Sequence, residues 1–86
     1  MRSRPMELVR RMMPALYYCA REGADLRIDA TTRAVLASLA TDLLMLTDAA
    51  LDAMTPDDRD EAVVRDLERA RQRLRTAREL GGSNAG

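Results

Sequence analysis

The chain has 86 residues, in which 14 arginines balance 14 acidic residues, and it contains one cysteine but no lysine and no histidine. This length allows one domain at most, and the zero net charge excludes a global electrostatic attraction to nucleic acid or to an anionic membrane. The missing histidine excludes His-based acid–base catalysis, His-ligated metals and His-containing triads, and a single cysteine excludes an intrachain disulfide.

The composition favours helices throughout. Ala, Leu, Arg, Glu and Met dominate, whereas the strand-forming Val, Ile and aromatic residues are scarce. We therefore predict an all-α fold with a single helical domain over residues 1–80. We expect a small antiparallel three-helix bundle, a helical hairpin of the second and third helices with the first packed across it. Arginine without lysine is typical of a GC-rich coding genome and suggests a bacterial or phage source.

The first helix is predicted over residues 4–22. Pro5 suits the first helical turn, and Gly23 is a natural residue to end a helix. At about 100° per residue, one face collects seven apolar or small side chains. These are Leu8, Val9, Met12, Met13, Leu16, Cys19 and Ala20. Tyr18 is predicted to face solvent.

Two features of this helix have more than one interpretation. The methionines Met6, Met12 and Met13 either fill gaps in the core or form an adaptable surface for a partner helix. Cys19, on the inner face, is interpreted as a small buried hydrophobe, with redox sensing as the alternative.

The second helix is predicted over residues 30–54, with Asp29 or Thr31 as its N-cap. A heptad-like apolar seam is formed by Leu36, Leu39, Leu43, Leu46, Ala50 and Ala53. A second stripe beside it contains Ala40, Leu44, Thr47, Leu51 and Met54. Together the two stripes are wider than one neighbouring helix can cover, which predicts a central helix with two partners.

The opposite side of the second helix is polar. Its acids are Asp42, Asp48 and Asp52, of which only Asp48 and Asp52 share a face, with no third ligand at matching spacing. We therefore interpret the three acids as a solvated surface and predict no metal, cofactor or catalytic residue. Met45 lies among these acids and, together with Tyr18, marks a place for an outward apolar contact.

The third helix is predicted over residues 56–80, because Thr55 reads as an N-cap and Pro56 as the first helical residue. Its seam is formed by Val63, Leu67, Ala70, Leu74 and Ala77. Residues 81–86 have nothing to bury and are predicted to be a flexible C-terminal tail.

Five arginines cluster near the end of this helix: Arg69, Arg71, Arg73, Arg75 and Arg78. Arg69 and Arg73 flank the seam on one side, and Arg71, Arg75 and Arg78 flank it on the other. Their heads can meet acids within the chain, acids of a partner protein or second subunit, or the phosphates of a nucleic acid. The acidic start of the helix weakens the last interpretation.

These observations predict a small non-catalytic protein–protein interaction module that acts by helix–helix packing, such as an adaptor, anti-activator, inhibitor or secretion chaperone. A bundle without large aromatic residues buries little surface, so we expect a homodimer mate or a helical protein partner. The alternative is an Arg-dependent nucleic-acid-binding regulator, and a third class is a small helical enzyme that uses only Arg and Glu. We expect a cytoplasmic protein with no membrane segment and no small-molecule substrate.

Overall fold

The computed structural model describes residues 4–85, and the side chains of residues 78 and 80–85 are outside that description. The chain forms α1 (Arg4–Gly23), α2 (Ala30–Asp52), a short 3-10 turn η1 (Pro56–Asp58) and α3 (Glu61–Ala85). Over this range the chain contains no strand. The predicted all-α three-helix bundle is therefore confirmed.

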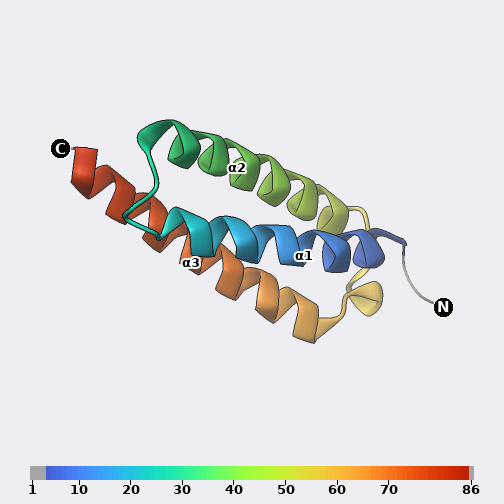
Figure 1. Cartoon of the computed structure of the whole chain (residues 1–86). Coiled ribbons are helices and arrows are strands. Elements are labelled where there is room, and N and C mark those ends of the chain that lie inside the picture. The colour runs from blue at the N-terminus through green and yellow to red at the C-terminus, as the bar shows by residue number, and fades with distance from the viewer. Residues whose placement is uncertain (1–3, 86) are drawn as a thin grey trace.

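α1, rather than α2, is the central helix. It lies between α2 and α3 in Figure 1 and packs against both, whereas α2 and α3 contact one another only sparsely. Gly23 of α1 lies against Ala77 of α3, and a Cβ added at Gly23 would be at ordinary contact distance, 3.5 Å, from the Cβ of Ala77. The prediction that α2 occupies the centre was wrong, because the buried side chains of α1 supply the layer that both other helices cover.

The main core lies along α1. Val9, Met13 and Leu16 pack with Leu67 and Ala70 of α3, and half-buried leucines of α2 close the cluster. A second cluster joins Cys19 to Leu36 and Ala40 of α2. Full burial of a side chain such as Leu16 contributes about 1.5–3 kcal/mol. Leu8 does not belong to this core, contrary to the prediction, since 57% of its surface stays exposed.

The start of α3 differs from the prediction. Thr55 makes no capping hydrogen bond, and the residues after it form only the single turn η1 before Arg59 returns to an extended conformation. α3 then begins after Asp60, whose carboxylate accepts a hydrogen bond of 3.0 Å from the N–H of Ala62. The cap is therefore Asp60, because an aspartate carboxylate one residue before the helix can reach its free N–H groups.

The other helix ends lie close to the predicted ones. α1 ends at Gly23 and α2 at Asp52. Asp29 takes the N-cap position of α2 in an extended conformation without a side-chain cap hydrogen bond. α3 continues to Ala85 instead of ending near residue 80. The predicted flexibility of this segment stays a prediction, and Gly86 lies outside the described residues.

Candidate functional site

The most apolar helix, α2, is only sparsely buried. Of the 23 residues of α2, only Leu36, Ala40 and Thr47 are buried. Thr47 satisfies its hydroxyl within the helix by donating a hydrogen bond of 2.9 Å to the carbonyl oxygen of Leu44. If neighbouring helices covered the whole apolar face of α2, far more of its residues would be buried.

One side of α2 carries a row of exposed apolar side chains, which we call the α2 stripe. It comprises Val35, Leu39 and Leu46, whose surfaces are 61%, 43% and 57% exposed. The prediction that Leu39 and Leu46 face inward was wrong. α1 covers the neighbouring face of α2, and no helix in the described part of the chain covers the stripe itself.

The other side of α2 borders an open groove, which we call the α2/α3 groove. Its volume is about 470 Å³. The groove is lined by Cys19, Gly23, Arg33, Leu36, Ala37, Ala40, Thr41, Leu44, Arg71, Leu74, Arg75 and Ala77. Apolar side chains from all three helices thus form its floor, and arginines from α2 and α3 lie among them.

Arg71 forms the principal polar link between α3 and α2. Its guanidinium donates two hydrogen bonds to Asp48, from Nη1 to Oδ2 at 3.3 Å and from Nη2 to Oδ1 at 2.5 Å. This pairing raises the pKa of Arg71. The Nε atom is buried without a hydrogen bond, and the nearest acid is Glu68, at 3.7 Å. Part of the arginine cluster therefore serves the chain's own structure.

A second groove lies on the α1/α3 side, with a volume of about 650 Å³. Tyr17 and Tyr18 line it together with Arg21 and Arg73. The guanidinium carbon of Arg73 lies 5.4 Å from the centre of the Tyr17 ring, and that of Arg21 lies 6.0 Å from the Tyr18 ring. Both distances are in the range of cation–π attraction.

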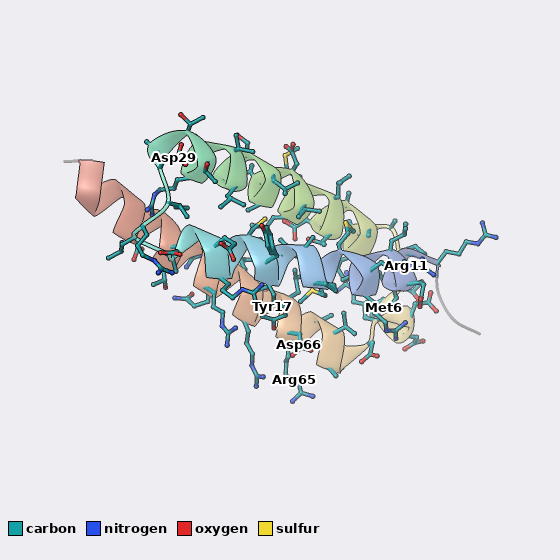
Figure 2. All side chains as sticks on the ribbon, viewed as in Figure 1. Met6, Arg11, Tyr17, Asp29, Arg65 and Asp66 are labelled. Carbon is teal, nitrogen blue, oxygen red and sulfur yellow. The ribbon has the colours of Figure 1, made fainter. Side chains whose placement is uncertain are left out.

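Tyr17 is also fixed by its hydroxyl, which donates a hydrogen bond of 3.2 Å to the carbonyl oxygen of Asp66 on α3. Figure 2 shows the ring directed from α1 toward that part of α3.

The structure places the predicted arginines on two sides of α3. Arg73 meets α1 through Tyr17, and Arg71 meets α2 through Asp48, as the predicted flanking of the seam requires. Arg69 is exposed, with its nearest acid, Asp66, at 3.9 Å. Arg75 is exposed at the edge of the α2/α3 groove. The side chain of Arg78 lies outside the described residues, so its predicted position stays a prediction.

The predicted methionine surface does not form as one patch. Met6 and Met13 are buried, which leaves them unavailable to a partner. Met12 is half-buried, whereas Met45 and Tyr18 are exposed as predicted. Met45 lies about 100° around α2 from Leu46 and is therefore separate from the α2 stripe.

Cys19 has the environment of a structural cysteine. It is a free thiol with 2% of its surface exposed, and burial raises its pKa. Among the residues that the structure describes, no group of three His, Cys, Asp or Glu side chains is arranged to hold a metal ion.

α2 also has a length and composition that would allow it to cross a membrane. A mostly buried core helix of a soluble protein and a signal sequence near the N-terminus pass the same criterion, and only 11% of this stretch is buried, so the expectation of no membrane segment stays a prediction.

Comparison with known protein families, curated proteins and solved structures finds no match to this chain. Its function has to be inferred from its own surfaces. Sequence reasoning missed the exposure of Val35 and the contribution of Arg33 and Leu44 to a groove. The width of the apolar face of α2 was the available signal, because such a face needs more partners than this chain supplies.

Proposed function

We propose that this chain is a non-catalytic protein-interaction module that binds a helical protein partner on the α2 stripe. The observation that carries the proposal is the exposure of Val35, Leu39 and Leu46 on a helix that buries only three of its residues. Exposed apolar side chains that gather on one face of a protein are a feature of interaction surfaces. The three side chains lie four and seven residues apart on one face of α2, with Asp42 between Leu39 and Leu46. They form a ridge against which a partner helix can pack.

The partner is either a second copy of this chain or a different helical protein, and light scattering separates the two. If the partner is a second copy, the wild type is a dimer and the double variant Leu39→Ser/Leu46→Ser is a monomer. Because both leucines are exposed, their replacement preserves the fold, which circular dichroism checks.

If the wild type is a monomer, the partner is a different protein. Tagged wild type is then compared with the double variant in extracts of the native host, and proteins enriched only by the wild type are produced and measured by calorimetry. The affinity of the double variant should be at least tenfold lower, about 1.4 kcal/mol. Leu26→Ser, at an exposed leucine outside α2, should bind as the wild type does. A monomer that enriches the same proteins as the double variant contradicts the proposal.

One observation favours the alternative, an Arg-dependent nucleic-acid-binding regulator. The tyrosines and arginines of the α1/α3 groove combine aromatic faces with positive charge, which is the chemistry of single-strand binding. Against it, Asp66 lies beside Arg69 and the chain has no net charge. Salt-sensitive binding of single-stranded RNA or DNA that is lost in Arg73→Glu would favour this alternative.

A further inference from the structure

The α2/α3 groove is a separate surface from the α2 stripe, on the other side of the same helix. It is partly open to solvent, and its apolar lining includes Leu36 and Leu44 of α2, Leu74 of α3 and Cys19 of α1. α2 and α3 contact one another sparsely, so the groove is an unfilled seam between two helices. A seam of this kind is where a further helix joins a bundle.

The charge of the groove has one sign. In the part of the chain that the structure describes, its lining includes three arginines and no aspartate or glutamate. Arg71 is paired with Asp48 outside the lining set. Among the described residues, Arg33 donates hydrogen bonds only to main-chain oxygens, those of Gly23 at 3.0 Å and Asp25 at 3.1 Å.

Arg75 differs from the other two arginines. It makes no hydrogen bond or ion pair with any described residue, and its side chain is exposed beside the apolar floor. The groove therefore combines an apolar floor with an arginine whose charge is not neutralised. Positive charge at the edge of an apolar groove selects partners that carry negative charge beside an apolar face.

We propose that the α2/α3 groove binds an acidic amphipathic helix of a partner protein. The apolar face of that helix lies on Leu36, Leu44 and Leu74, and its flanking carboxylates pair with Arg75 and Arg33. A helix fits better than a small anionic amphiphile, because small-ligand sites enclose most of their ligand and this groove is open along one side. Docking of an amphipathic helix into an apolar groove is a recurrent mode of peptide recognition.

The probe for this site is a fluorescein-labelled helical peptide of about 18 residues with leucines at heptad a and d positions and glutamates at e and g. Its matched control carries lysines in place of the glutamates. Fluorescence anisotropy should show saturable binding of the acidic peptide and none of the basic one. Binding should weaken as salt is raised from low to physiological strength, since part of the attraction is between charges at the surface.

The decisive variant is Arg75→Glu, which reverses a charge without removing any recorded contact. It should weaken binding of the acidic peptide at least about fivefold. Arg65→Glu is the matched control. Arg65 lies on the same helix but extends away from the bundle in Figure 2, and its charge reversal should leave binding unchanged. Leu44→Ser should weaken binding of the acidic peptide, and the basic control peptide should still show no binding.

Four results would overturn the proposal. The first is no saturable binding of the acidic peptide up to about 1 mM, and the second is equal loss in Arg65→Glu. The third is Arg75-dependent binding of duplex DNA or single-stranded RNA tighter than that of the peptide. The fourth is concentration-dependent dimerisation lost in Arg75→Glu, which would make a second copy the occupant. Leu39→Ser/Leu46→Ser leaves peptide binding intact, so this site and the proposed function stand or fall separately.

Discussion

Arg10 of α1 donates a hydrogen bond of 2.9 Å to the carboxylate of Asp60, the same carboxylate that caps α3. The side chain of Asp60 thus fixes both the start of α3 and the position of α3 against α1. Arg10 also contacts Glu7 at 3.3 Å within its own helix, so its guanidinium is held from two sides. The change of direction before α3 is therefore fixed by an ion pair between two residues that lie fifty positions apart in the chain, and not by the local turn alone.

The first prediction concerns this junction. Asp60→Ala removes a helix cap and the Arg10 pair together, and it should lower Tm by about 5 °C or more. Thr55→Ala should shift Tm by no more than about 2 °C, because Thr55 makes no cap hydrogen bond and donates only to the nearby Asp58 carboxylate. Differential scanning calorimetry of both variants provides the comparison. Equal shifts would mean that α3 is capped at Thr55 after all.

The second prediction is acid sensitivity at the same site. The hydrogen bond from Arg10 holds the pKa of Asp60 below its ordinary value, and that from Arg27 does the same for Asp25. The unfolded chain therefore binds more protons than the folded one as the pH falls toward and below about 4. This stabilisation is complete above the unfolded pKa and is lost as the pH falls through the folded pKa.

Urea midpoints measured between about pH 6 and pH 2 should fall with acidity in the wild type. Asp60→Asn should show a lower midpoint near neutral pH and a shallower fall, because one depressed carboxylate is gone. An unchanged slope in this variant would show that Asp60 does not contribute to the acid response.

The third prediction separates core methionine from surface methionine. Met6 is 1% exposed and Met45 is 66% exposed. Met6→Ala should cost about 2–5 kcal/mol of unfolding free energy, as truncation of a buried methionine does, whereas Met45→Ala should change it by less than about 0.5 kcal/mol. Chemical denaturation of both variants measures these differences. A loss of unfolding free energy as small in Met6→Ala as in Met45→Ala would contradict the buried position of Met6 and favour its interpretation as part of a partner-binding surface.

The helices themselves were predictable because each carries a strong local signal. Pro5 near the start of α1 and the 3.6-residue spacing of Val9, Leu16 and Ala20 are properties of a short stretch of chain, and the structure has these residues where the spacing predicts them. The three-helix architecture followed from the number of amphipathic helices in the sequence. Helix ends were harder. Thr55-Pro56 was interpreted as the start of the third helix, whereas the structure places that start after Asp60, which caps α3 and pairs with Arg10.

The arrangement around α2 was not predictable in the same way. A heptad-like seam identifies which residues of a helix are apolar, but not which of them find a neighbour. Leu39 and Leu36 belong to the same predicted seam, yet only Leu36 is buried, because α1 takes the central position. Likewise, Arg71 and Arg75 lie one turn apart on α3, and only Arg71 has an aspartate within reach.

The fourth prediction uses Cys19 to report on the packing of the bundle. Its thiol is 2% exposed, and burial raises its pKa, so the folded protein presents little thiolate at neutral pH. Reaction with a disulfide reagent at pH 7 should be at least about 100-fold slower in native buffer than in denaturant, where the core is open. The reaction of the folded protein should also reach half of its limiting rate at a higher pH than that of the unfolded chain. Rapid, stoichiometric labelling of the native protein would contradict the packed environment of α1 and would favour the redox-sensing interpretation of this cysteine.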